Sequence, residues 1–174
     1  MRLLVVRHAI AEDREAFARS HKDDSERPLT PEGRRKMERA AHGLKELVPE
    51  LDVLAASPYK RAVETAEIIG GAYGALNVER VPELAPGAGV DRVVGWLAGR
   101  HALGNVAVVG HEPDLGRLAG LMTGAGIALP LKKAGACAIG FDGAAAAGGG
   151  SLLWLLPPRV LRLLGGKELA PHER

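Results

Sequence analysis

Short apolar runs alternate with helix-like segments over the first two thirds of the chain. Residues 3–6, 51–56 and 105–109 are almost entirely apolar and have the length of a strand. Continuous apolar runs of this length are typical of strands buried on both faces of a parallel sheet. A shorter strand is expected at 77–81. The pattern therefore predicts four strands before residue 110.

Amphipathic segments with recognisable start and stop signals lie between these runs. Thr30-Pro31-Glu32 offers an N-cap, a proline at the first helical position and an early carboxylate. The helix that follows is expected to end at Pro49, and its apolar stripe comprises Met37, Ala40, Ala41, Leu44, Leu47 and Val48. Ser57-Pro58 is expected to cap a second helix that ends near Ile69, before Gly70 and Gly71. Two more helices are predicted at 91–97 and 113–121, and polar or turn-rich loops at 12–29 and 82–89.

The last third of the chain has a different pattern. The segments ACAIGF and SLLWLL flank an Ala- and Gly-rich stretch at 142–150. Two apolar segments joined by a short Gly-rich connection predict an antiparallel hairpin at a sheet edge. Pro157-Pro158 should end the hairpin. We expect one domain over residues 1–164 and a flexible tail at 165–174.

Strands that alternate with helices favour an α/β fold with helices on both faces of the sheet. We predict a three-layer sandwich whose sheet is mainly parallel, with an antiparallel edge. Ligands of such sheets bind beyond the carboxyl ends of the strands. Arg7-His8 and Gly110-His111 follow two predicted strands, and a third leads into Ser57 and Arg61. These side chains are expected to converge, although strand order cannot be deduced from the pattern.

Composition excludes several classes of function. The 174 residues suit one domain, and the formal net charge of +2 is too small to favour a nucleic-acid partner. The densest basic stretches are residues 32–40, where Glu32 and Glu38 alternate with the cations, and the pair Lys132–Lys133. No apolar run reaches the roughly 18 residues of a membrane span. The single cysteine, Cys137, forms no internal disulfide and no Cys/His cluster has zinc spacing, so we expect a cytoplasmic protein without a metal.

Arginine and histidine at the predicted strand ends suit phosphate chemistry. The planar guanidinium groups of Arg7 and Arg61 can each donate two hydrogen bonds to phosphate oxygens. Helix starts near Pro58 and Pro113 would add backbone N–H groups. Each residue alone is equally compatible with a structural role, so the hypothesis depends on their combination.

The motifs as they stand resemble those of the histidine phosphatase superfamily, which includes the cofactor-dependent phosphoglycerate mutases. Arg7-His8-Ala9 resembles its R-H-G signature, with Ala in place of Gly. SPYKRAVETA at 57–66 is similar to its S-P-x-x-R-A-x-x-T-A segment, and VGHEP at 109–113 resembles its second-histidine segment. Within the superfamily the chain is most similar to SixA-type phosphohistidine phosphatases, through RPLT at 27–30, PELAPG at 82–87 and its short length. The resemblance implies a phosphoglycerate mutase-like fold.

The resemblance also implies roles for individual residues. His8 would attack phosphorus and carry a phosphohistidine, while Arg7, Arg61 and His111 hold the phosphoryl oxygens. Ser57 is a further candidate for contacting phosphate, for capping its helix, or for both. Glu83 is the candidate general acid, because residues 83–87 resemble the E-x-x-x-G stretch of mutases; it could equally be a surface carboxylate. We expect neither a cofactor nor a metal.

Three functions remain open on the sequence. The first is removal of phosphate from phosphohistidine in a protein. The second keeps the chemistry but acts on a small phosphorylated metabolite, with the loop at 12–29 as the specificity element. The third is a phosphate-binding module without turnover. No nucleic-acid or membrane partner is expected.

Overall fold

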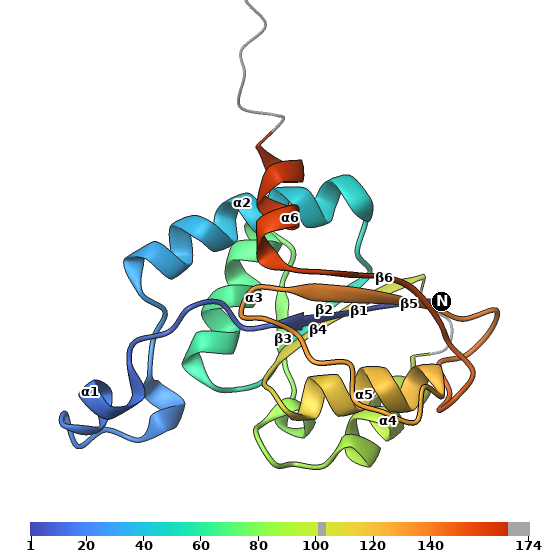
Figure 1. Ribbon diagram of the computed structural model, residues 1–174, viewed down its shortest axis with the longest axis horizontal. Coiled ribbons are helices and arrows are strands. Elements are labelled where there is room, and N and C mark those ends of the chain that lie inside the picture. Colours follow the sequence, from blue (N-terminus) through green and yellow to red (C-terminus); the bar gives the residue numbers. More distant parts are fainter. Residues whose placement is uncertain (101–103, 167–174) are drawn as a thin grey trace, which may run out of the picture.

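The computed structural model describes residues 1–100 and 104–166 and places a six-stranded sheet between two layers of helices (Figure 1). The strands are β1 (Arg2–Arg7), β2 (Val53–Ala56), β3 (Val78–Arg80), β4 (Asn105–Gly110), β5 (Ala136–Gly140) and β6 (Ser151–Leu156). The α-helices are α1 (Arg14–Ala18), α2 (Pro31–Leu47), α3 (Lys60–Ala72), α4 (Val90–Ala98), α5 (Asp114–Thr123) and α6 (Pro158–Gly165). Two short 3-10 helices, η1 (Asp24–Glu26) and η2 (Pro82–Leu84), complete the description.

The order of strands in the sheet is β3-β2-β4-β1-β5-β6. Strands β3, β2, β4 and β1 run parallel, whereas β5 is antiparallel to both β1 and β6. The expected mainly parallel sheet with an antiparallel edge is therefore confirmed. Because β1 and β4 are neighbours at the centre, their carboxyl ends lie side by side, in register from Arg2 opposite Asn105 to Arg7 opposite Gly110.

Each face of the sheet is covered by its own helices and its own apolar core. Helices α2, α3 and α6 cover one face, and α4 and α5 cover the other (Figure 1). Successive residues of a strand point to opposite faces; in β1, Leu4 and Val6 therefore enter the first core, and Leu3 and Val5 the second. Burial on both faces is the physical reason for the uninterrupted apolar runs of the central strands.

Most of the predicted elements are present, with shifted ends. Thr30 caps α2 as expected, since its hydroxyl accepts a hydrogen bond from the Gly33 N–H at 2.9 Å. Helix α3 differs from the prediction: it begins after Tyr59 rather than at Ser57-Pro58, and it continues through Gly70 to Ala72. Gly70 lies within the helix and is needed there for packing, because a Cβ at this position would lie 2.5 Å from the Leu76 carbonyl oxygen.

Three short elements were not expected from the sequence. The predicted loop at 12–29 contains α1 and η1, and η2 lies within the predicted turn region at 82–89. Asp13 and Asp23 cap α1 and η1 by accepting hydrogen bonds from Ala16 N–H and Ser25 N–H, both at 2.9 Å. These caps are local hydrogen bonds that stabilise short helices with little apolar periodicity.

Helix α6 is the largest difference between the expected and the observed elements. Pro157-Pro158 follows the end of the hairpin as expected, since β6 stops at Leu156, but no helix was predicted after it, and Pro158 is the first residue of α6. Gly43 and Gly165 allow α6 to cross closely over α2: a Cβ on Gly43 would lie 1.9 Å from the Leu161 carbonyl oxygen. The expected tail at 165–174 thus starts inside a helix, and residues 167–174 lie outside the described part of the chain.

The cysteine and both tryptophans contribute to the interior. Cys137 is fully buried in β5, and Trp96 and Trp154 pack against the two cores. His21 is exposed, whereas His101 and His172 fall outside the described residues. Within residues 1–100 and 104–166, no helix combines the length and the hydropathy that crossing a membrane would require.

Candidate active site

Polar side chains lie directly after the carboxyl ends of three neighbouring strands, β1, β4 and β2. His8 follows β1, and its N–H donates to the Gly110 carbonyl of β4 at 3.0 Å. Ser57 follows β2, and its N–H donates to the Val109 carbonyl at 2.9 Å. His111 follows β4, so its ring comes to lie beside that of His8, with 5.1 Å between the ring centroids. Ladder hydrogen bonds of the parallel sheet therefore bring together residues more than 100 positions apart.

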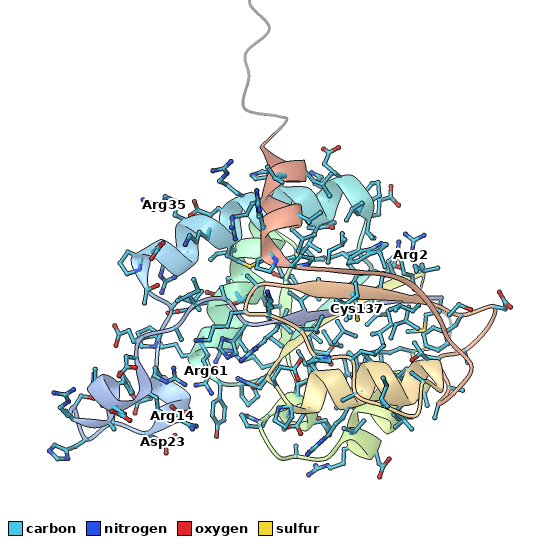
Figure 2. All side chains as sticks on the ribbon, viewed as in Figure 1. Arg2, Arg14, Asp23, Arg35, Arg61 and Cys137 are labelled. Carbon is cyan, nitrogen blue, oxygen red and sulfur yellow. The ribbon has the colours of Figure 1, made fainter. Side chains whose placement is uncertain are left out.

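Arg61 joins these residues from the first turn of α3. Its side chain is only 4% exposed, and Figure 2 shows it on the side of the molecule where Arg14 and Asp23 lie. Tyr59, which precedes α3, holds its ring 4.9 Å from the Arg61 guanidinium carbon and 5.3 Å from the His111 ring centroid. The site therefore contains a buried cation close to an aromatic ring, a contact that adds to the stabilisation of the guanidinium.

A cavity of about 630 Å³ opens above these strand ends. All four residues predicted to hold or attack phosphate, Arg7, His8, Arg61 and His111, line it. Other charged or aromatic residues of the lining are Glu12, Asp13, Arg14, Asp24, Arg27, Tyr59, Glu112 and Lys133. Ser57 does not line the cavity; it is fully buried beneath His111.

The ring of His8 is held in one tautomer. Its Nδ1 lies 2.7 Å from the Ala9 carbonyl oxygen, which can only accept, so Nδ1 carries the proton and Nε2 presents a lone pair. The Ala9 N–H donates to Thr65 Oγ1 at 3.0 Å, and Thr65 Oγ1 donates to the Arg61 carbonyl at 2.6 Å. Thr65 thus links the backbone beside His8 to the turn of α3 that carries Arg61.

Burial keeps both histidines neutral. The pKa of His8 is lowered from 6.5 to about 4, chiefly by burial and to a lesser extent by the charges of Arg61, Arg7 and Lys133, against the opposing hydrogen bond to Ala9. Burial thus lowers the pKa of His8 more than the positive charges around it do. Burial also lowers the pKa of His111 to about 2, with smaller contributions from His8 and Arg61.

Several buried side-chain nitrogens at the site have no hydrogen-bond partner within the described part of the chain. These are the Nε atoms of Arg7 and Arg61, and the Nδ1 atom of His111. The His111 Nε2, in contrast, lies 2.8 Å from Ser57 Oγ. Buried polar atoms are nearly always hydrogen-bonded, so a cluster of unpaired nitrogens beside a cavity favours an anionic oxygen ligand.

The segment at 12–29 contacts the site through Asp24. The Arg61 Nη1 donates to the Asp24 backbone carbonyl at 2.8 Å, and Nη2 lies 3.1 Å from its carboxylate. The same carboxylate accepts from Arg27 Nε at 2.8 Å. Although burial opposes it, the hydrogen bond from Arg27 and the charge of Arg61 hold the pKa of Asp24 at about 2. The predicted specificity loop is therefore attached to the arginine expected to bind phosphate.

Glu64 fastens the same segment to α3. Its carboxylate accepts from the Leu29 N–H at 2.7 Å and pairs with Arg34 at 2.6 Å.

The candidate acid Glu83 and the carboxylate of Asp13 lie in different places. Glu83 is outside the lining of the large cavity; it borders a 10 Å³ space next to His111, 3.9 Å from Arg92. Asp13 lines the large cavity and caps α1.

Sequence reasoning missed residues whose placement depends on distant contacts. Tyr59, Asp24, Arg27 and Lys133 all line the cavity. Tyr59 lies within the motif at 57–66 and could have been considered from it. Asp24 and Lys133 carried no comparable signal. No group of three His, Cys, Asp or Glu side chains among residues 1–100 and 104–166 is arranged to hold a metal ion.

Comparisons with known proteins agree with this geometry. The sequence model of the histidine phosphatase superfamily (branch 1) matches residues 3–86. An uncharacterized protein of Picosynechococcus is 35% identical over 139 residues, which are 78% of this chain and 82% of the relative.

Two solved structures are similar over nearly their whole length. The protein histidine phosphatase SixA in complex with tungstate has a TM-score of 0.79 and 27% identity, over 92% of this chain and 99% of that one. A structure from Nakamurella, named for a SixA phosphohistidine phosphatase, has a TM-score of 0.72 and 26% identity, over 90% and 95% of the two chains.

Proposed function

The chain belongs to the histidine phosphatase superfamily and is a phosphatase, and we propose that it removes phosphate from phosphohistidine in a protein through a phosphohistidine at His8. The observation that carries this proposal is the tautomer of His8. Because the Nδ1–H of His8 donates a hydrogen bond to the Ala9 carbonyl, the Nε2 lone pair is available at neutral pH, in a cavity lined by several cationic side chains.

The reaction would proceed in two transfers. In the first, the Nε2 of His8 attacks phosphorus, the new N–P bond forms, and the P–N bond of the substrate breaks. The released electron pair stays on the substrate imidazole nitrogen, which takes a proton from water. In the second, water attacks phosphorus, the N–P bond at His8 breaks, and inorganic phosphate leaves.

The positive groups around His8 would supply most of the rate enhancement. Arg7 and Arg61 present guanidinium donors to the cavity, and their buried Nε atoms have no partner among the described residues. The neutral ring of His111 adds a buried Nδ1 that has no partner among residues 1–100 and 104–166. Donors that are fixed before the reaction stabilise the charge that develops on the phosphoryl oxygens without reorganisation.

The position of Glu83 supports a phosphohistidine substrate. An alkoxide leaving group needs a proton from a general acid, whereas the imidazole of phosphohistidine leaves readily. Glu83 does not line the large cavity. Of the carboxyl groups that do, Asp24 has a low pKa held by Arg27 and Arg61, Asp13 caps α1, and Glu112 accepts the Leu131 N–H. The 27% identity to a protein histidine phosphatase over 92% of the chain favours the same substrate class.

A small phosphorylated metabolite is the second candidate substrate. A cavity of about 630 Å³ has the size of a small-molecule site, and the segment with Asp24 and Arg27 forms one of its walls. The two candidates share their chemistry and differ in what surrounds the phosphoryl group.

Trapping the phosphoenzyme tests the mechanism. Wild-type protein is mixed with a ³²P-phosphohistidine carrier domain, quenched in alkali, in which phosphohistidine is stable, and digested to map the label. We expect label on the peptide with His8, and none in His8→Ala. Label on another residue, or turnover by a folded His8→Ala variant, would refute the nucleophile; binding of phosphate without turnover by wild type would indicate the non-catalytic module.

A substrate panel tests the specificity. Release of phosphate from the phosphohistidine carrier domain is compared with release from phosphoserine, sugar phosphates and p-nitrophenyl phosphate at equal concentrations. We expect kcat/KM to be highest for the carrier domain. Turnover of the monoesters without turnover of the phosphoprotein would select the metabolite phosphatase instead.

A further inference from the structure

The turn at residues 131–134, which precedes β5, is hydrogen-bonded to residues of the candidate active site. Leu131 donates its N–H to Glu112 at 2.7 Å and accepts a hydrogen bond from Arg7 Nη1 at 2.8 Å. The Ala134 N–H lies 3.2 Å from the carbonyl oxygens of both Arg7 and His8. Hydrogen bonds therefore join the segment 131–134 to Arg7, His8 and Glu112.

The geometry of this turn is specific. Ala134 has a φ of 59°, a left-handed conformation that costs an alanine about 1 kcal/mol. The Gly135 N–H closes the turn by donating to the Lys132 carbonyl at 2.7 Å. Several hydrogen bonds around a strained residue fix the backbone of this turn, and with it the point from which each side chain departs.

Lys133 is the residue that this turn presents to the cavity. Its side chain lines the cavity together with His8, whereas the adjacent Lys132 does not. Arg14, Arg27 and Arg61 each form an ion pair with Asp24, but the Lys133 ammonium has no ion pair or hydrogen bond within the described part of the chain. Lys133 is thus a cation at the site whose charge is not already compensated by a carboxylate.

We propose that Lys133 is a substrate-binding residue, which contributes a further positive charge to the phosphoryl group that approaches His8. The proposal rests on the proposed function, since it concerns the substrate of that same site. A lysine ammonium is a mobile point charge on a flexible stem, suited to attracting a phosphoryl dianion and following it during transfer. An exposed charge at the mouth of a cavity acts mainly on the association rate and on its dependence on salt.

Matched lysine variants test the proposal. Lys133→Gln removes the charge, Lys133→Arg keeps it, and Lys132→Gln removes the neighbouring charge outside the cavity. We expect kcat/KM for the phosphohistidine carrier domain to fall about fivefold in Lys133→Gln, mostly through KM, and to change less than about twofold in the other two variants. The fall of kcat/KM between 50 and 300 mM NaCl should become shallower in Lys133→Gln alone.

The pH profile provides a second readout. Arg7, Arg61 and His111 also face His8, and they are unchanged in these variants. Removal of the Lys133 charge should raise the pKa of His8 and move the acid limb of kcat/KM to higher pH. Equal effects of Lys133→Gln and Lys132→Gln, or an unchanged salt slope and acid limb, would overturn the proposal. If wild type forms no phosphoenzyme, the proposed function itself fails. The Kd for inorganic phosphate, measured directly in the same variants, then still decides whether Lys133 binds phosphate.

Discussion

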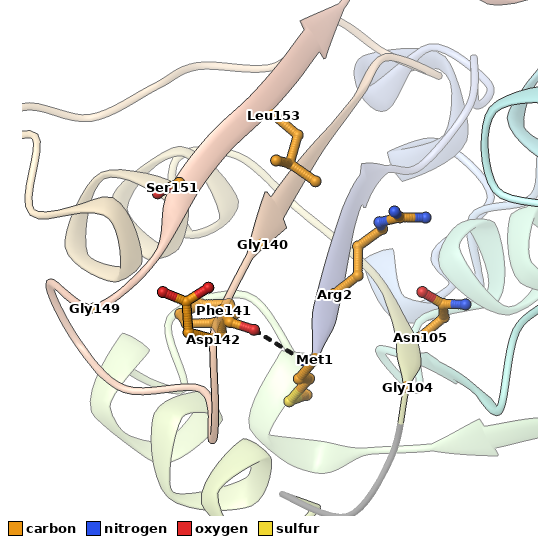
Figure 3. A pocket seen from close by; sticks show the side chains of 10 residues that line it. All are labelled: Met1, Arg2, Gly104, Asn105, Gly140, Phe141, Asp142, Gly149, Ser151 and Leu153. Atoms are coloured by element: carbon orange, nitrogen blue, oxygen red, sulfur yellow. Dashed lines mark hydrogen bonds between the residues drawn. The ribbon is translucent and has the colours of Figure 1, made fainter.

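The two ends of the central strands both border a cavity, but the cavities differ in character. At the amino ends of β1 and β4, an open space of about 360 Å³ is lined by Arg2, Asn105, Asp142 and Ser151 (Figure 3). The polar side chains of that lining are exposed or half-buried. The fixed contact drawn there is a hydrogen bond from the amino group of Met1 to the Phe141 carbonyl at 2.9 Å.

At the carboxyl ends of the same strands, the polar groups are buried. His8 is 7% exposed, His111 4% and Arg61 3%. Burying a charge or an unpaired polar atom costs free energy, so such groups persist where other contacts hold them in place. The burial of polar side chains therefore identifies the functional edge of the sheet more clearly than cavity size does. An arginine beside a cavity is common, whereas a buried arginine beside two neutral histidines is not.

Truncating one arginine at each end should give the largest contrast. Arg61→Ala removes guanidinium donors from the site and should lower kcat/KM by about 10²–10³-fold. Arg2→Ala removes an arginine from the opposite cavity and should change kcat/KM by less than about twofold. Phosphate release from the carrier domain measures both, with Tm as the control for folding. Comparable losses in the two variants would contradict the assignment of the site to the carboxyl ends.

Thr65 offers a smaller effect at the same end. Thr65→Val keeps the shape of the side chain but removes the oxygen that accepts from Ala9 N–H and donates to the Arg61 carbonyl. We expect kcat to fall about tenfold with little change in KM, because His8 and Arg61 lose their common support. Thr65→Ser should recover most of the loss. A fall in Tm without a fall in kcat, or no recovery by serine, would assign Thr65 to stability alone.

The lowered pKa values of the two buried histidines predict how activity and stability depend on pH. His8 is active only when neutral, and because its pKa is about 4 rather than 6.5, kcat/KM should stay nearly constant down to about pH 5. The folded protein keeps both histidines neutral, so their contribution to stability is complete above pH 6.5 and decreases as the pH falls, down to about 4 for His8 and to about 2 for His111. Tm measured from pH 7.5 to 4.5 should therefore fall less in His8→Gln than in wild type. An acid limb near pH 6.5 would show that His8 is not buried in this way.

The comparison also explains which parts of the fold were predictable from sequence. The central strands could be recognised because burial on both faces leaves an uninterrupted apolar run, and the β5–β6 hairpin because a Gly-rich stretch separates two such runs. Helix α6 could not be recognised, since Pro158 ends one element and begins the next. Its position depends on Gly43, 115 residues earlier in the chain, where α2 leaves room for it.

The site was predictable to the extent that strand ends determine it. Arg7, His8 and His111 follow parallel strands directly, and the motif at 57–66 places Arg61 one turn into the next helix. Asp24 and Lys133 reach the cavity through a polar loop and a turn before an antiparallel strand. Neither position follows from local periodicity, because each depends on hydrogen bonds to segments distant in sequence.

Glu83 should show the smallest effect, and its size depends on the substrate. Glu83→Gln removes the candidate acid, which lies outside the lining of the large cavity and 3.9 Å from Arg92. With the phosphohistidine carrier domain we expect kcat to change less than about threefold, since the imidazole leaving group needs little assistance. With p-nitrophenyl phosphate, whose leaving group is also a weak base, the change in kcat should be similar. With an alkyl phosphomonoester, whose leaving group is a strong base, kcat should fall more where Glu83 acts as the general acid. A loss of more than about tenfold on the carrier domain would make Glu83 a general acid for the P–N bond, and the substrate argument from its position would then be wrong.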